Sequence, residues 1–264
     1  VDLLSRRDCS ELAKIEDRDP AAPDVALEAL VTREFNGDPG RRFFTLEPIP
    51  RAVTLWTAEY EASLAPGVPV VVTVVRPDAD ALLAADLPLL PLLAPWFHVP
   101  KEAFRAATDD FPLTLRRRLD QVRQAAAFMR LADDERAGGM LGAPVCYRDF
   151  CTPGILTLEH IAGVTVAEAV KAIGEPPSAS VLDREAIGRQ LASGWLRQAL
   201  VGTVVPFDFG LHDLRLQGKR LVLTGGAFEP QTAAGQARFL NYLVAVAADD
   251  TDIAAAWIVA AATP

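Results

Sequence analysis

The sequence predicts an α+β fold, with an antiparallel sheet and helices in the first part of the chain and a mainly helical second part. Three observations support this prediction. Between Phe43 and Arg76, runs of β-branched residues alternate with turn residues, which is typical of consecutive strands. Later stretches repeat apolar residues at three- and four-residue spacing, as amphipathic helices do. A hairpin pattern at 211–224 interrupts those helices.

The first part of the chain alternates between helical and extended patterns. Residues 1–35 are patterned as helix, with breaks at Pro20 and Pro23, because proline removes a backbone hydrogen bond and clashes with the preceding turn. A turn at 36–40 follows. After it we expect strands at 54–64 and 68–75 joined by an Ala65-Pro66-Gly67 turn, a helix at 78–87, a helix at 113–131, and two short strands between 144 and 159 around a Thr152-Pro153-Gly154 turn.

The helix expected at 113–131 has the clearest pattern. Its apolar residues recur every three or four positions, which places them on one face of a single helix. They are Leu115, Leu119, Val122, Ala126 and Met129. In the second part of the chain, further helices are predicted at 183–200, 232–247 and 251–261.

Composition excludes several classes of partner. The 264 residues carry a formal net charge of −9, whereas surfaces that bind nucleic acid are basic. We therefore expect no nucleic acid partner, and broad contact with anionic lipid is disfavoured. The most apolar stretch, 82–97, contains three prolines and is too short to span a bilayer, so no transmembrane segment is expected.

The cysteines and the first residues bear on the compartment. Cys9, Cys146 and Cys151 are odd in number and lack the spacing of a disulfide framework or a zinc site. The chain opens Val-Asp-Leu-Leu-Ser-Arg-Arg, with charge where a secretory signal has an apolar run. Both observations favour a reducing compartment, and we expect the protein in the cytoplasm.

Asp208-Phe209-Gly210 has the sequence of the magnesium-binding tripeptide of protein kinases. Its position differs from the kinase arrangement, in which a hairpin follows the catalytic loop and the tripeptide comes after the hairpin. Here the hairpin at 211–224 comes after Asp208. By position, Asp208 therefore corresponds to the catalytic aspartate, and Gly225 takes the place of the metal-binding aspartate.

Five stretches carry a family pattern. They are L-A-K-I-E-D-R-D-P-A-A-P at 12–23, V-V-V-T-V-V-R-P-D at 70–78, L-D-Q-V-R-Q-A-A-A at 119–127, I-L-T-L-E-H-I-A-G-V at 155–164 and F-D-F-G-L-H-D-L-R-L at 207–216. Together they resemble the UbiB/AarF-type atypical kinases, a family tied to ubiquinone and other isoprenoid-quinone lipids. The resemblance implies a bilobal protein-kinase-like fold. Its N-lobe, at 1–157, would hold the sheet and an αC-like helix, and its mainly helical C-lobe, at 158–264, the catalytic-loop hairpin.

The resemblance also assigns the positions that bind nucleotide and metal in the family. The strand lysine that holds the nucleotide phosphates corresponds to Thr73, and the helix glutamate that orients it corresponds to Gln124. Asp208 takes the catalytic position. Asp213 corresponds to the metal-binding asparagine, and a carboxylate there can still bind magnesium. Glu159 corresponds to the glutamate of the hinge strand.

These replacements predict a pseudokinase. Thr73 has no positive charge and Gly225 has no side chain, although phosphoryl transfer depends on neutralising charge. Trp56 lies where the family has a nucleotide loop of small residues. We therefore expect no cofactor and no phosphotransfer, and a binding, scaffolding or regulatory role in a lipid- or quinone-related pathway. The expected partner is a protein, such as an active member of the family, and peripheral contact with a membrane is a further option.

Two alternatives stay open. One is a divergent ATPase or small-molecule phosphotransferase, in which ATP is the cofactor and Asp208 and Asp213 hold one magnesium ion. The other is a carrier of a hydrophobic ligand that uses the leucine- and proline-rich stretch at 82–97. Magnesium-dependent nucleotide affinity would support the first alternative, and a co-purified lipid would support the second.

Overall fold

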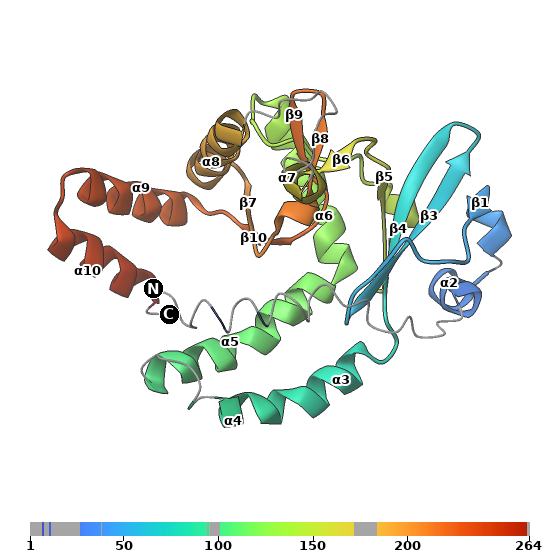
Figure 1. Cartoon of the computed structure of the whole chain (residues 1–264), viewed down its shortest axis with the longest axis horizontal. Coiled ribbons are helices and arrows are strands. Elements are labelled where there is room, and N and C mark those ends of the chain that lie inside the picture. The colour runs from blue at the N-terminus through green and yellow to red at the C-terminus, as the bar shows by residue number, and fades with distance from the viewer. Residues whose placement is uncertain are drawn as a thin grey trace. The chain divides into compact units, whose positions relative to one another are not determined.

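The structure is a computed structural model that describes residues 27–37, 39–93, 101–171 and 184–262, together with positions 7, 11 and 95. These residues form two compact units, and each is described by itself (Figure 1). The first unit contains the described residues up to Ala125 and Tyr147–His160, and the second contains Ala126–Cys146 and the described residues from Ile161 onward. The units interleave along the sequence, whereas the lobes predicted from it, 1–157 and 158–264, do not.

The first unit is built on a five-stranded sheet in which every neighbouring pair is antiparallel. Its strands are β1 (Thr45–Leu46), β2 (Ala52–Val53), β3 (Thr57–Ala65), β4 (Val68–Val75) and β5 (Ile155–Glu159). β3 and β4 are joined by a tight turn at Gly67, whose φ of +80° suits glycine. β1 and β2 pair with β3, and β5 pairs with β4. The strands predicted at 54–64 and 68–75 are thereby confirmed.

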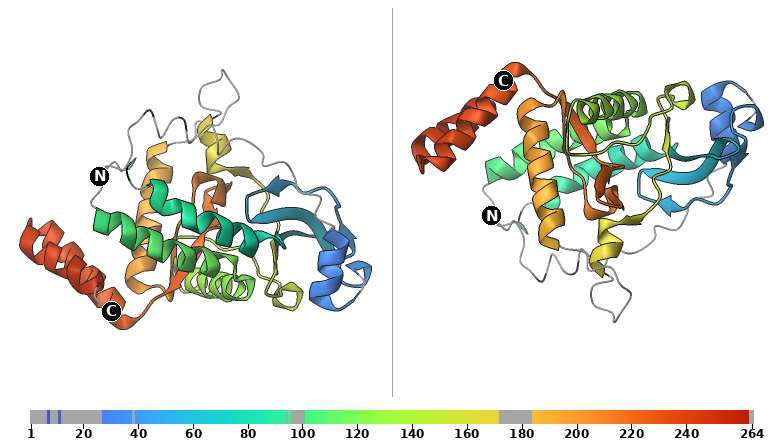
Figure 2. Two further views of the ribbon diagram at one scale, coloured as in Figure 1. Left: turned by 90° about the horizontal axis from the view of Figure 1, so that it is seen from below. Right: turned by 90° about the horizontal axis from the view of Figure 1, so that it is seen from above.

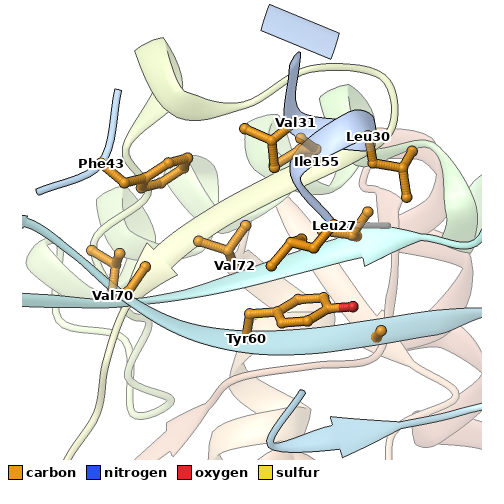
Figure 3. Packing of buried hydrophobic residues seen from close by; sticks show 11 residues of the cluster. Leu27, Leu30, Val31, Phe43, Tyr60, Val70, Val72 and Ile155 are labelled. Atoms are coloured by element: carbon orange, nitrogen blue, oxygen red, sulfur yellow. The ribbon is translucent and has the colours of Figure 1, made fainter. Parts of the chain in front are cut away.

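One face of this sheet is covered by α2 (Leu27–Phe35). Alternate residues of β4 point to this face, because successive side chains of a strand point to opposite sides. α2 contributes apolar side chains at helical spacing. The buried cluster, most of which is labelled in Figure 3, comprises Leu27, Leu30, Val31, Phe43, Ala58, Tyr60, Ala62, Val70, Val72, Val74 and Ile155. Burial raises the pKa of the Tyr60 hydroxyl.

Glu34 of α2 stabilises the turn that precedes β5 by hydrogen bonding to it. Its carboxylate accepts hydrogen bonds from the Thr152 hydroxyl at 2.8 Å and from the Gly154 backbone N–H at 3.3 Å. Burial opposes ionisation of Glu34, but the hydrogen bonds from Thr152, Arg33 and Gly154 outweigh it and lower the pKa of this carboxyl. The predicted turn at Thr152-Pro153-Gly154 is present and bridged by Thr152 and Ile155.

The pair of strands predicted between 144 and 159 is half wrong. β5 is the second of them, but the segment before the turn forms a 3-10 helix, η4 (Arg148–Phe150). The Tyr147 N–H donates to the Thr157 carbonyl at 3.0 Å. The chain therefore makes a backbone hydrogen bond to β5 at Tyr147 and then enters η4, so that no second strand pairs with β5 there.

The single helix predicted at 113–131 is wrong in extent and in phase. Two helices are present, α5 (Lys101–Leu119) and α6 (Gln121–Arg136). Asp120 separates them, because its Oδ1 accepts the Arg123 backbone N–H at 3.0 Å, as an N-cap does. Because α6 begins as a new helix after Asp120, its buried face is rotated relative to the predicted one. Val122 and Met129 are therefore 53% and 40% exposed. The buried residues of α6 are instead Gln121, Gln124, Ala125, Ala127, Phe128 and Leu131.

The other helical predictions for the first unit are tested in part. The helix predicted at 78–87 is confirmed as α3 (Ala79–Asp86), which continues through the 3-10 helix η2 (Leu87–Leu89) into α4 (Leu90–Leu93). The end of the apolar stretch 82–97 lies largely outside the described residues. So does the motif at 12–23, and of the helical pattern at 1–35 the structure describes mainly α2.

The second unit combines helices with two small antiparallel sheets. After α6, its elements are β6 (Val164–Thr165), α7 (Val166–Lys171), α8 (Arg184–Val201), β7 (Val204–Phe207), η6 (Leu211–Asp213), β8 (Leu214–Gln217), β9 (Arg220–Leu223), β10 (Ala227–Pro230), α9 (Ala233–Ala247) and α10 (Thr251–Ala262). β6, β8 and β9 form one sheet, and β7 and β10 form the other. The hairpin and the three helices predicted for this part are confirmed, whereas β7 and β10 were not predicted. In the part of the chain that is described, no helix has both the length and the apolar character needed to cross a bilayer.

Candidate functional site

The loop after β7 holds the residues that the sequence analysis assigned to a catalytic loop. Asp208 follows β7 directly, with a φ of +47°, a left-handed conformation that aspartate tolerates better than most residues. The residue is exposed. Phe209 and Gly210 then lead into η6, whose last residue is Asp213. The loop therefore presents one exposed acid and ends on a second.

The carboxylate of Asp213 is used by the loop itself. Its Oδ2 accepts the Gly210 backbone N–H at 2.9 Å, and His212 Nε2 lies 3.3 Å from the same oxygen. The Asp213 carbonyl oxygen accepts the backbone N–H of Thr224 at 2.7 Å and its hydroxyl at 3.1 Å. These contacts hold η6 against the segment that follows β9.

Gly225 lies directly against Asp213. A Cβ atom added at Gly225 would lie 2.1 Å from Asp213 Oδ1 and 2.9 Å from its Cγ. A side chain therefore does not fit at Gly225 while Asp213 keeps its position, because protein interiors leave no such overlap. At Gly226, which has a φ of +109°, an added Cβ would lie 2.8 Å from the Cβ of Phe209. The two glycines allow the segment after β9 to pack on the loop after β7.

Glu135 of α6 supports the hairpin formed by β8 and β9. It accepts two hydrogen bonds from Arg220 of β9, each 2.7 Å long, and a third from the Ala143 backbone N–H at 3.0 Å. Such two-pronged pairs fix geometry as well as adding energy. Burial opposes ionisation of Glu135, but the hydrogen bonds and charge of Arg220, with the Ala143 N–H, lower the pKa of this carboxyl.

Asp134, the neighbouring residue, supports the start of β7. Its Oδ2 accepts hydrogen bonds from Gln198 Nε2 at 2.5 Å and from the Thr203 backbone N–H at 2.8 Å. The same Gln198 nitrogen donates to the Val204 carbonyl at 2.7 Å. Sequence reasoning missed these supporting residues, because the Asp133-Asp134-Glu135 run resembles a solvated helix face and its partners are distant in sequence.

Thr73 lies in β4, between Glu59 of β3 and Leu156 of β5. It is half-buried and belongs to the set of β4 residues that alternate with the buried Val72 and Val74. Its side chain is therefore on the opposite face of the sheet from α2. A hydroxyl at this position carries no charge that could neutralise phosphate.

Gln124 has a structural role at the junction of α5 and α6. The side chain is buried, and its Nε2 donates to the Arg117 carbonyl at 3.2 Å. Gln121, also buried, donates to the Leu119 carbonyl at 3.1 Å. These carbonyls belong to the last turn of α5, where no intrahelical donor is available. Gln124 thus acts as a donor, which a glutamate carboxylate at the same position could not do.

The segment at Trp56 forms a turn that is stabilised by hydrogen bonds among its own residues. Thr54 Oγ1 accepts the backbone N–H of Trp56 at 3.2 Å and that of Thr57 at 2.9 Å, and the Thr54 N–H donates to the Thr57 carbonyl at 2.8 Å. The connection from β2 to β3 is thus a short turn with its own internal hydrogen bonds.

Glu159 is the last residue of β5, opposite Val70 in β4, and is half-buried.

The predicted site residues therefore fall into two groups. Asp208, Asp213 and Gly225 belong to the second unit, and the structure brings Asp213 and Gly225 into contact. Thr73, Gln124 and Glu159 belong to the first unit. Within the described ranges, no three histidine, cysteine, aspartate or glutamate side chains gather in a way that could hold a metal ion.

The model of the ABC1 atypical kinase-like domain matches residues 14–255 of this chain. The chain belongs to this family. The resemblance of the five stretches to UbiB/AarF-type kinases is thereby confirmed. The ABC1 chain is 31% identical over 180 residues to the probable protein kinase UbiB of Pseudomonas putida strain GB-1, covering 64% of this chain and 32% of that protein. A protein of the same name from Azotobacter vinelandii strain DJ is 30% identical over 178 residues.

The ABC1 chain spans 32% of the length of these curated relatives. Among solved structures, it is similar to Rv3197 from Mycobacterium tuberculosis, determined in complex with erythromycin. The TM-score is 0.64 at 17% sequence identity, and the match covers 96% of this chain and 63% of that one. At this identity the likeness shows the fold alone. Together with the family match it confirms the predicted α+β, protein-kinase-like fold.

Proposed function

We propose that this ABC1 domain is a pseudokinase, which does not transfer phosphate and acts as a binding or regulatory module for a protein partner in a lipid- or quinone-related pathway. An active member of the family is the partner that the proposal favours. The observation that carries it is the contact between Gly225 and Asp213. The metal-ligand position has no side chain, and the neighbouring carboxylate takes the space into which one would project.

The charges around the site support the same proposal. Thr73 supplies no cation for the phosphates, and one oxygen of the Asp213 carboxylate is already used by the Gly210 N–H. Removing one preorganised electrostatic group typically lowers a rate by about 10²–10³-fold, and here both the lysine and the aspartate positions are replaced. The donor set therefore does not fit a magnesium nucleotide as the family would bind it.

Two other functions compete with this proposal. A divergent ATPase or phosphotransferase would use Asp208 and Asp213 to hold a single magnesium ion with ATP. A carrier of a hydrophobic ligand would use the stretch at 82–97, where Leu89 and Leu92 are exposed. Native mass spectrometry of the purified chain tests the carrier function, because a bound lipid would add its mass to the protein.

Nucleotide binding tests the proposal directly. We expect calorimetric titration of the full chain with ATP or ADP to give no binding heat up to millimolar nucleotide, with or without magnesium, and no phosphate release. Asp208→Asn removes the exposed acid of the loop, and Asp149→Asn is the matched control, an exposed aspartate in η4 of the first unit. Magnesium-dependent binding or phosphate release that Asp208→Asn abolishes and Asp149→Asn preserves would overturn the proposal.

A further inference from the structure

Glu59 of β3 lies directly opposite Thr73 of β4. The two residues are partners in the antiparallel register of these strands, so their side chains lie on the same face of the sheet, with Cβ atoms about 4.5–5.5 Å apart. We call this side the Thr73 face; α2 packs on the other side of the sheet (Figures 1 and 2). The position that the sequence analysis assigned to a phosphate-binding lysine therefore has a carboxylate as its neighbour.

A second carboxylate lies on the Thr73 face. Glu61 is two residues after Glu59 in β3, and alternate residues of a strand point to the same side. Tyr60, between them, points to the other side and is buried with α2. The side chains of Glu59 and Glu61 are 39% and 59% exposed, so both are within reach of a solute. The face thus carries two acids where phosphate binding calls for positive charge.

The arginine beside these acids is engaged by both of them. Arg51 Nε lies 3.7 Å from Glu59 Oε2, and Arg51 Nη1 lies 3.8 Å from Glu61 Oε1. The Arg51 backbone N–H donates to the Glu59 carbonyl at 2.8 Å, which holds this arginine at the edge of the sheet. Two carboxylates and one guanidinium give the group a formal charge of −1. Arg51 therefore does not replace the missing lysine.

We propose that Glu59 excludes anionic ligands, nucleotide phosphates among them, from the Thr73 face. The inference rests on the function proposed above and deepens it, because the face lacks a cation and also carries an opposing charge. The effect does not depend on which cations Glu59 contacts. A carboxylate repels a nearby phosphate, and a carboxylate that holds a cation competes with phosphate for that cation. Placing a charge against the wrong ligand is a general means of specificity.

Thiol reagents of opposite charge test this role. Thr73→Cys, in a full chain whose three native cysteines are replaced by serine, places one thiol on the Thr73 face. Its reaction rates are measured with anionic sulfonatoethyl methanethiosulfonate and with cationic trimethylammonioethyl methanethiosulfonate. Each rate is divided by the rate of the same reagent with 2-mercaptoethanol. The ratio of the two normalised rates reports local charge, because both reagents attack the same thiolate and its ionisation cancels.

We expect the cationic reagent to be favoured and this preference to fall with Glu59→Gln. One charge about 6 Å away in water changes each rate about threefold. The two reagents respond in opposite directions, so their ratio should change about tenfold. Molar salt should remove most of the preference, because the Debye length is then about 3 Å. Asp109→Asn is the matched control, since it removes the same charge from α5 of the same unit, where the Asp109 side chain is 73% exposed.

Four results would overturn the role of Glu59. They are a ratio that does not favour the cationic reagent, a ratio that Glu59→Gln leaves unchanged, a ratio that Asp109→Asn changes equally, and an introduced thiol that neither reagent modifies. In the last case access, and not charge, would exclude anions. Circular dichroism checks that each variant is folded. Nucleotide titration of the parent chain is a separate measurement, because binding there overturns the pseudokinase function, whereas the reagent ratio bears on Glu59 alone.

Discussion

Gly225 and Asp213 show how a position without a side chain shapes the contacts of its neighbour. With no side chain at 225, the Asp213 carboxylate turns into that space and hydrogen-bonds to its own loop. Gly225 does not lie in the left-handed region of backbone conformation. Glycine is therefore required here because the Asp213 carboxylate leaves no room for a side chain, and not because of the backbone conformation. A larger residue at position 225 must displace the hydrogen-bonded carboxylate of Asp213, and this displacement should lower the stability of the fold.

We predict that Gly225→Ala lowers the free energy of unfolding by about 1–3 kcal/mol, the usual effect of overpacking, as measured by urea denaturation at neutral pH. Gly188→Ala is the matched control. It lies in α8, and an added Cβ would meet no atom within 4 Å, so this change should instead stabilise the chain by about 0.5–1 kcal/mol. In an Asp213→Ala background the effect of Gly225→Ala should shrink. An unchanged effect there would show that the two residues are not coupled.

Among the elements, the junction of α5 and α6 departs most from what the sequence suggests. A single apolar period runs from Leu115 to Met129, yet Asp120 ends that period by capping a new helix. Gln121 and Gln124 then donate to the open end of α5. Helix propensity and periodicity are local signals, whereas this break is stabilised by side chains that reach back across the junction.

Gln124→Glu is expected to destabilise the chain by about 2 kcal/mol or more, because the buried donor is replaced by an acceptor that faces a carbonyl oxygen. Urea denaturation at pH 7 measures this change. Gln190→Glu is the matched control, since Gln190 also donates to a backbone carbonyl, that of Lys219, but at an exposed site. The control should change stability by no more than about 0.5 kcal/mol. Equal effects of the two substitutions would contradict the role assigned to Gln124.

The elements that sequence reasoning missed share a physical cause. β7 and β10 are four residues each, contain Pro206 and Pro230, and pair with one another. Proline is a signal against strands, and their pairing joins segments that are separated by the whole hairpin. The strands β3 and β4 were predictable because they are long, rich in β-branched residues and joined by a tight turn.

For the whole molecule, the fold was predictable because family motifs are spread along the chain. Four of the five fall on described segments, at β4, at the start of α6, at β5 and at the loop and hairpin that follow β7. The state of the site was predictable only in part. The sequence predicts which chemical groups are replaced at Thr73 and Gly225, but the direction of the Asp213 carboxylate depends on Gly210 and Thr224, which no motif couples to it. Fold does not determine function, which depends on such local contacts.

Acid sensitivity is expected of both units, because each contains a half-buried glutamate with a lowered pKa. Glu34 belongs to the first unit and Glu135 to the second, and both have an ordinary pKa of 4.5. A carboxyl whose pKa is lower in the folded than in the unfolded chain stabilises the fold above the unfolded pKa. That stabilisation is lost as the pH falls through the folded pKa.

We therefore expect the free energy of unfolding to be nearly constant with respect to these two groups near neutral pH and to fall as the pH drops below about 4.5. Urea denaturation at a series of pH values measures it. Glu34→Gln and Glu135→Gln should each lower stability at pH 7 and flatten the acid limb. Glu185→Gln is the control, because the Glu185 side chain is 82% exposed and pairs with Arg189 of the same helix. Acid limbs of equal slope in the parent and in both buried-site variants would contradict the assignment.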